Sequence, residues 1–146
     1  MSLDAPALAL RLALARNEAF YRAFDTLKVE AMDRIWARED QVVCIHPGRE
    51  ALVGWPAVRE SWEQVFAETT WLRVTPTRVH AELAGSVAVV SCLENITVQS
   101  ETGLGLATAE ATNLFRWVRN EGWFLFLHHA SAVSSSLELP VFGLMQ

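Results

Sequence analysis

The chain has only two cysteines, which limits the cross-links and metal sites that it can form. Cys44 and Cys92 each lie inside an apolar run typical of a strand, so we expect two buried free thiols. A disulfide between them stays open on sequence grounds, although a pair of cysteines without a secretory signal argues against it. No cysteine–histidine spacing typical of a zinc site is present, so the sequence predicts no metal.

Other signatures of known chemistry are missing as well. The chain has no glycine-rich phosphate loop, no Gly-x-Ser-x-Gly turn and no Cys–His nucleophile pattern, so we expect no cofactor. Four histidines are present, at positions 46, 80, 128 and 129. A metal site built from them is disfavoured, because adjacent histidines on a strand point to opposite faces and cannot easily bind one ion.

Positive charge is scarce, and long apolar runs are absent. Twelve Lys and Arg residues stand against 17 Asp and Glu residues, which gives a net charge of −5, and no basic run occurs. A nucleic-acid surface is therefore not favoured. The Leu- and Ala-rich segment 5–15 is interrupted by Arg11, which favours an amphipathic helix over a signal peptide or membrane span. We accordingly expect no membrane partner and a cytoplasmic location.

The chain is rich in apolar residues, since 51% of its residues are hydrophobic and six are tryptophan. At this length we expect one domain over residues 1–146. Apolar residues at three- and four-residue steps predict a helix over about 5–25, and a second, shorter helix containing Val29, Met32, Ile35 and Trp36. A strand follows at 41–46. Gly54 and Pro56 mark the start of a third helix, whose buried stripe is Val58, Trp62, Val65 and Phe66.

After residue 70 the pattern changes to that of strands. Four runs, 71–83, 87–99, 106–118 and 123–133, are separated by short turns, which favours antiparallel hairpins. Pro76 indicates an edge strand or a bulge. Helices followed by an antiparallel meander predict an α+β fold, with the helices packed on one face of a curved sheet. Residues 134–146 are expected to form a C-terminal tail.

Several short motifs occur in a fixed order over about residues 12–133. They are Asn17-Glu18-Ala19-Phe20, Glu30-Ala31-Met32, His46-Pro47-Gly48, the Gly54–Val58 helix start, Ala111-Thr112-Asn113-Leu114-Phe115-Arg116, and Gly122-Trp123 leading to His128-His129-Ala130-Ser131. With them the chain resembles the nuclear transport factor 2-like superfamily, in its SnoaL-like and ketosteroid-isomerase-like branch. The resemblance implies a cone that encloses a pocket for a small apolar organic ligand, and a homodimer formed through the outer sheet face.

The resemblance also suggests roles for particular residues. Isomerases of that branch use a carboxylate before a Pro-Gly-like turn as proton shuttle, and His46 stands at the matching place. Their acidic hydrogen-bond donor on a late strand is matched by Asn113. Their first-helix tyrosine is matched by Phe20, which lacks the hydroxyl, while Tyr21 lies one step away on a different helical face.

The residues themselves support His46 and Asn113 as candidate catalytic residues. Pro47 keeps His46 extended at the strand end, and imidazole titrates near neutral pH, where a base is most useful. Asn113 lies on a strand face of small and then large residues (Ala107, Ala109, Ala111, Phe115 and Trp117), which suits a tapering cavity. Its amide would donate to a ligand carbonyl or oxyanion. The alternatives are a lining histidine without catalytic duty and an amide bonded to His46, His129 or the backbone.

The adjacent histidines divide between the two faces of the last strand. Trp123, Leu125 and Leu127 would share a face with His129, which we place in the pocket as a third catalytic candidate. His128 then lies at the subunit interface, and the alternative exchanges the two. Phe20, Cys44, Trp62 and Trp117 are expected ligand contacts. Glu94 and Glu110 lie mid-strand and could reach the pocket, although carboxylates on a sheet are usually solvated.

Two functions from different classes remain. The first is a SnoaL-like small-molecule-binding protein that acts as an isomerase, cyclase or dehydratase, with His46 moving a proton and Asn113 and His129 steadying an oxyanion. The second is a non-catalytic dimeric ligand-binding or association module with the same cavity, since one fold carries many functions.

Overall fold

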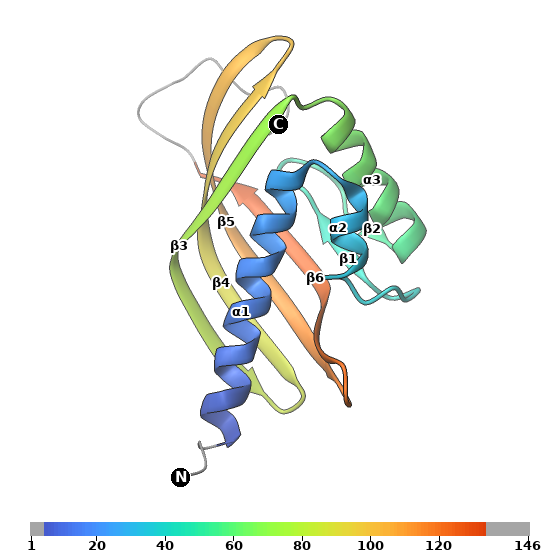
Figure 1. The fold of residues 1–146 in the computed structure, drawn as a ribbon, viewed down its shortest axis with the longest axis vertical. Coiled ribbons are helices and arrows are strands. Elements are labelled where there is room, and N and C mark those ends of the chain that lie inside the picture. Colours follow the sequence, from blue (N-terminus) through green and yellow to red (C-terminus); the bar gives the residue numbers. More distant parts are fainter. Residues whose placement is uncertain (1–4, 134–146) are drawn as a thin grey trace.

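The structure is a computed structural model and describes residues 5–133. Three helices, α1 (Ala5–Thr26), α2 (Val29–Asp33) and α3 (Trp55–Ala67), lie on one side of a curved sheet, as Figure 1 shows. None of the helices in this part of the chain is both long and apolar enough to cross a bilayer. The α+β fold predicted from the sequence is confirmed.

The sheet has six strands in the order β2-β1-β6-β5-β4-β3. They are β1 (Val43–Ile45), β2 (Leu52–Val53), β3 (Trp71–Ala84), β4 (Val87–Ser100), β5 (Gly103–Val118) and β6 (Gly122–Ala132). All neighbouring strands are antiparallel except β1 and β6, which run parallel. The four long strands agree closely with the predicted ones, because short turns leave room only for hairpins.

The short elements before residue 54 differ from the prediction. The second helix ends at Asp33, and Trp36 instead forms an isolated bridge to Leu125 of β6. The strand predicted over 41–46 is only Val43–Ile45, and the two-residue β2 was not predicted. Tertiary pairing decides both, since such short segments carry little periodicity of their own.

Pro76 and Gly54 each occupy a position that suits the backbone preferences of proline and glycine. Pro76 lies in β3, which is an edge strand, and the β3–β4 register shifts just after it, between Thr77 and His80. Gly54, with φ +93°, precedes α3 and donates its N–H to the carbonyl of Val42 at 2.8 Å. This bond fixes the start of α3 beside β1, and a side chain at position 54 would be strained.

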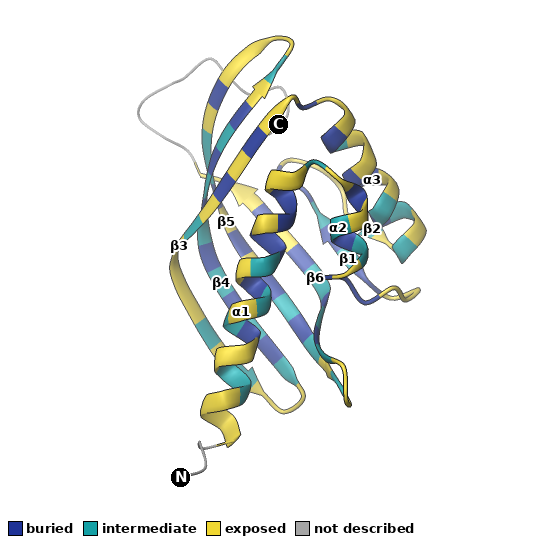
Figure 2. Ribbon diagram, in the orientation of Figure 1, coloured by how far each residue is buried: buried dark blue, intermediate teal, exposed yellow. Residues whose placement is uncertain are grey.

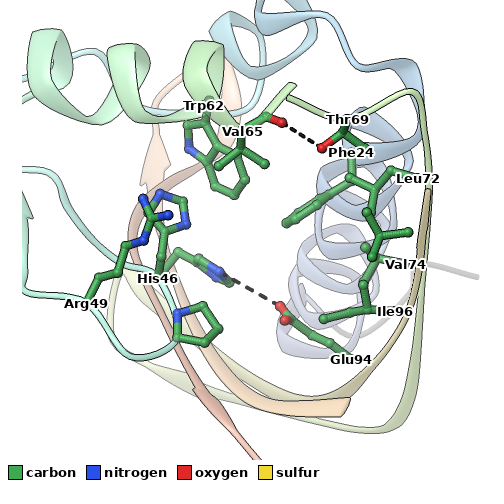
Figure 3. Close-up of a pocket in the computed structure, with 13 residues that line it drawn as sticks. Phe24, His46, Arg49, Trp62, Val65, Thr69, Leu72, Val74, Glu94 and Ile96 are labelled. Carbon is green, nitrogen blue, oxygen red and sulfur yellow. Dashed lines mark hydrogen bonds and ion pairs between the residues drawn. The ribbon is translucent and has the colours of Figure 1, made fainter. Parts of the chain in front are cut away.

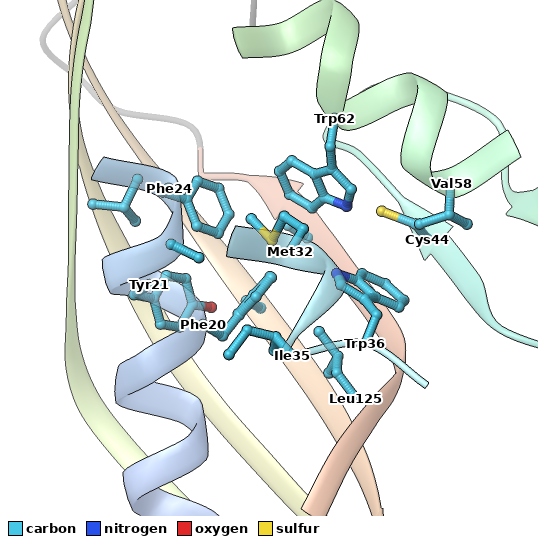
Figure 4. Packing of buried hydrophobic residues seen from close by; sticks show 14 of the residues in the cluster. Phe20, Tyr21, Phe24, Met32, Ile35, Trp36, Cys44, Val58, Trp62 and Leu125 are labelled. Atoms are coloured by element: carbon cyan, nitrogen blue, oxygen red, sulfur yellow. The ribbon is translucent and has the colours of Figure 1, made fainter. Parts of the chain in front are cut away.

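The core fills the space between the helices and the concave side of the sheet. Figure 2 shows buried residues along the sides of the helices that face the sheet and at alternate positions of the strands. Phe20 lies at its centre, with no exposed surface and with the rings of Phe24, Trp36 and Trp62 within 6.4 Å (Figure 4). Aromatic rings therefore join α1 to α3 and to the segment that follows α2.

A bulge in β6 reverses the side-chain alternation, and it corrects one prediction. Leu114 pairs with Leu127 and Phe115 pairs with Leu125, so Phe126 has no partner on β5. Residues up to Leu125 follow one parity and those after the bulge the other. As a result His128 is buried on the concave side and His129 is exposed on the outer side. The placement of His129 in the pocket and of His128 outside it was therefore wrong.

Candidate functional site

A cavity of about 60 Å³ lies between α1, α3 and the inner face of the sheet. Figure 3 shows His46, Arg49 and Trp62 on one side of it, Leu72, Val74 and Ile96 on the other, and Glu94 close to Ile96. Its walls are mainly apolar. The full lining is Phe24, His46, Pro47, Arg49, Trp62, Val65, Thr69, Leu72, Val74, Glu94, Ile96, Val98 and His128.

Glu94 of β4 and His128 of β6 bring two titratable groups to this cavity from the two sides of β5. Oε2 of Glu94 lies 3.8 Å from Nε2 of His128, and the side chains are only 3% and 2% exposed. Burial raises the pKa of Glu94 from 4.5 to about 7. Burial lowers the pKa of His128 to about 3, with smaller contributions from His46 and His129. Both changes favour the uncharged forms, so the imidazole is neutral near pH 7.

Asn113 fixes the tautomer of His128. Its Nδ2 donates to Oδ1 of Asn17 at 2.8 Å and to the hydroxyl of Tyr21 at 3.0 Å. The amide oxygen is therefore the acceptor in the 2.6 Å contact with Nδ1 of His128, which must carry the proton. In the neutral ring Nε2 then holds the lone pair, and it is the nitrogen that faces Glu94.

Tyr21 completes the network around the carboxyl group. Its hydroxyl donates to Oε2 of Glu94 at 2.7 Å, while it accepts from Asn113 and, at 3.3 Å, from the thiol of Cys92. The pKa of Tyr21 is raised, first by burial and then by the charge of Glu94. The phenol therefore stays protonated and keeps one oxygen of Glu94 occupied.

His46 is positioned by the tight turn that follows it. Its carbonyl accepts from the N–H of Arg49 at 3.0 Å across Pro47 and Gly48, and φ of +73° at position 48 suits glycine. The hydroxyl of Ser61 donates to the carbonyl of Val58 at 2.6 Å, so Ser61 accepts the proton on Nε2 of His46 at 2.9 Å. Burial, with a smaller effect of Arg49, lowers the pKa of His46 to about 4, which makes it a weak base.

Comparison with known proteins shows the family to which this fold belongs. The family profile of the SnoaL-like domain matches residues 13–135. The chain belongs to this SnoaL-like family. A Streptomyces avermitilis structure, provisionally described as a dehydratase from the NTF2-like family, is 31% identical with a TM-score of 0.83, over 90% of this chain and 100% of that one. Nuclear transport factor 2-like membership, predicted from the sequence, is thereby confirmed.

Other relatives of this SnoaL-like domain carry different descriptions. A Thiobacillus denitrificans structure, provisionally described as a calcium/calmodulin-dependent protein kinase type II association domain, is 33% identical with a TM-score of 0.72. The match covers 82% of this chain and 94% of that one. The F-box protein SKIP8 of Arabidopsis thaliana is 24% identical over 123 residues, which are 84% of this chain and 50% of that protein. The SnoaL-like domain thus spans about half the length of this curated relative.

The predicted site residues fall into three groups. His46 and Trp62 line the cavity. Phe20, Cys44 and Asn113 are buried behind the lining, and Asn113 is linked to the cavity through its bond to His128 and, by way of Tyr21, to Glu94. The roles in catalysis or ligand binding that the sequence suggested for these five residues stay predictions.

His129 and Trp117 lie away from the cavity. Trp117 is 41% exposed and contributes to a separate groove beside α1, together with Leu12 and Trp123. It shares the inward parity of Asn113, but it lies near the end of β5, beside Leu12 and Ala15 of α1. The expected ligand contact at Trp117 was therefore misplaced.

Sequence reasoning missed Tyr21 and Arg49, and it left Glu94 as one of two carboxylates. The alternation of β4 could have resolved Glu94, since it has the parity of the buried Cys92 and Ile96. Tyr21 lies one helical turn after the buried Asn17, which places the two on one face. Within the described residues, no cluster of three or more His, Cys, Asp or Glu side chains could hold a metal ion.

Proposed function

We propose that this SnoaL-like domain is an acid–base enzyme that eliminates water from a small β-hydroxy carbonyl compound. The observation that supports this reaction most is the buried pair of Glu94 and His128 at an apolar cavity. A pKa of about 7 suits Glu94 to both taking and giving a proton at neutral pH. The 31% identity to a protein provisionally described as a dehydratase supports elimination over other proton transfers.

In the proposed reaction Glu94 carries one proton through a complete cycle. As a carboxylate it takes the proton from the carbon next to the carbonyl, and the electron pair of that C–H bond moves toward the carbonyl oxygen. The pair then forms the carbon–carbon double bond while the β C–O bond breaks. The leaving hydroxyl takes the proton from Glu94 and departs as water, which returns Glu94 to the carboxylate.

His128 orients the substrate in this scheme. Because Nδ1 of His128 donates to Asn113, its Nε2 offers a lone pair that accepts a hydrogen bond from the substrate hydroxyl beside Glu94. Tyr21 holds one carboxyl oxygen, which leaves the other free for proton transfer. The sequence predicted His46 as a catalytic residue, and that role stays a prediction. Because its low pKa makes it a weak base, His46 lines the cavity and offers a hydrogen bond in this proposal.

The proposal is tested with 4-hydroxybutan-2-one and longer β-hydroxy ketones, by following absorption of the enone product. We expect turnover that rises with pH through about 7, as Glu94 ionises. Glu94→Gln should lower the rate by about 100-fold or more. Glu110→Gln removes a carboxylate exposed on β5 and should retain the rate. Absence of turnover across the series, or full activity of Glu94→Gln, would contradict the proposal.

The association module remains the alternative, because a 33% identical structure is described as an association domain. A homodimer through the outer sheet face would cover Leu104 and Leu106, which are exposed on β5. We expect sedimentation velocity to give a dimer. Leu106→Glu should convert it to a monomer, whereas Leu12→Glu, exposed on α1, should not. A monomeric parent protein argues against both the dimer and this alternative.

A further inference from the structure

The size of the cavity limits what can enter it. Small-molecule sites commonly measure about 300–1,000 Å³, whereas this cavity holds about 60 Å³. Only the reacting end of a ligand can therefore lie beside Glu94 and His128. The rest of the ligand must lie at the rim, so the groups at the rim select it.

Among the described residues that line the cavity, Arg49 is the one whose side chain carries a permanent charge. The turn that places His46 also brings Arg49 to the cavity, because the two residues close the turn with a 3.0 Å backbone hydrogen bond. Figure 3 shows the Arg49 side chain next to His46, across the cavity from Val74 and Ile96. The exposed side chain of Arg49 thus lies at the edge of a mainly apolar pocket.

No carboxylate neutralises Arg49 within residues 5–133. Arg59 pairs with Asp33 at 2.8 Å and Arg116 pairs with Glu39 at 3.1 Å, whereas Arg49 forms no ion pair in this range. Glu94 is the one carboxyl group that lines the cavity in this range, and it already accepts a hydrogen bond from Tyr21. A guanidinium with free donors at an apolar site is suited to binding a planar anion.

We infer that the ligand of this site is a small monoanion, whose carboxylate binds Arg49 while its apolar end enters the cavity. The inference rests on the proposed function for the role of the cavity, and it adds the class of substrate: a β-hydroxy carbonyl compound that carries a carboxylate away from the reacting carbons. Arg49 is then the residue that determines specificity. Figure 3 shows Arg49 and Glu94 on different sides of the cavity, so Arg49 would bind the carboxylate of the ligand without taking part in proton transfer.

The test compares ligands of equal shape and different charge. Dissociation constants for butyrate and butyramide, and for benzoate and benzamide, are measured by NMR shifts of the protein amides. We expect each carboxylate to bind at least about ten-fold more tightly than its amide. Arg49→Gln should lower carboxylate affinity to that of the amide and leave amide affinity unchanged. Added salt should weaken only the carboxylates.

Two further variants separate the outcomes. Arg38→Gln, at an exposed arginine outside the cavity lining, should keep the preference for carboxylates. Glu94→Gln should keep it too, so a retained preference with unchanged turnover in Glu94→Gln would reject the elimination reaction and leave the anion site standing. Equal affinity for the carboxylate and amide of each pair, no binding of either carboxylate, or a preference that survives Arg49→Gln would overturn the inference.

Discussion

Replacing Glu94 with glutamine should stabilise the protein at pH 8, by about 3 kcal/mol, although it removes the proposed proton carrier. Glutamine has nearly the same shape, and its carbonyl oxygen can still accept from the hydroxyl of Tyr21. The change removes a charge that is 3% exposed at a site whose pKa is raised from 4.5 to about 7. A tenfold change in proton affinity corresponds to about 1.4 kcal/mol, which gives a total of about 3 kcal/mol.

The effect should depend on pH in a defined direction. Because the pKa of Glu94 is higher in the folded state, its contribution to stability is complete below pH 4.5 and is lost as pH rises through about 7. The difference between Glu94→Gln and the parent should therefore be near zero at pH 4 and largest above pH 7. His46 and His128 have lowered pKa values and lose their contributions as pH falls, but they are present in both proteins.

Urea unfolding of both proteins from pH 4 to pH 8 measures this difference. Glu110→Gln removes the same charge from an exposed position on β5, and it should change the free energy of unfolding by no more than about 0.5 kcal/mol. A Glu94→Gln protein that is less stable than the parent at pH 8 would mean that the buried carboxylate is stabilised by its surroundings. The carboxylate would then be a poor proton carrier.

The sequence predicted best those elements whose residue pattern repeats over many positions. The four long strands and α1 have repeating patterns over many residues, so their bounds were predicted to within a few positions. The β6 bulge at Phe126 leaves no trace in composition, because its neighbours are apolar on both sides. That single extra residue exchanged His128 and His129, and with them the identity of the buried histidine.

The candidate site was predicted less well than the fold, because its hydrogen bonds join distant segments. Asn113 and Tyr21 are 92 residues apart, and Tyr21 and Glu94 are 73 apart. No spacing in a single sequence links them. The turn at His46 was recognisable from Pro47 and Gly48, since proline and glycine have fixed backbone preferences. What could not be seen was that the same turn brings Arg49 to the cavity.

Asn113→Leu should be the most destabilising polar substitution in the core, with a loss of about 3–5 kcal/mol in the free energy of unfolding. Leucine is similar in volume, so the change removes hydrogen bonds and leaves little void. It deletes the acceptor of His128 Nδ1–H and two donors, to Asn17 and to Tyr21. Asn113, His128 and Asn17 are all at most 2% exposed, so water cannot replace the lost partners.

Asn95→Leu provides a matched control on the neighbouring strand β4. Asn95 donates to the carbonyl of Thr75 and to the hydroxyl of Thr77, but both bonds are exposed, so water can take its place. Its loss should cost about 1 kcal/mol or less. Denaturant unfolding measures both variants, and the Nδ1–H proton of His128 in NMR spectra reports on the orientation of the ring. An Asn113→Leu protein as stable as Asn95→Leu, with this proton signal unchanged, would show that Asn113 does not hold His128, and the assignment of Nε2 as the nitrogen that faces the substrate would fail.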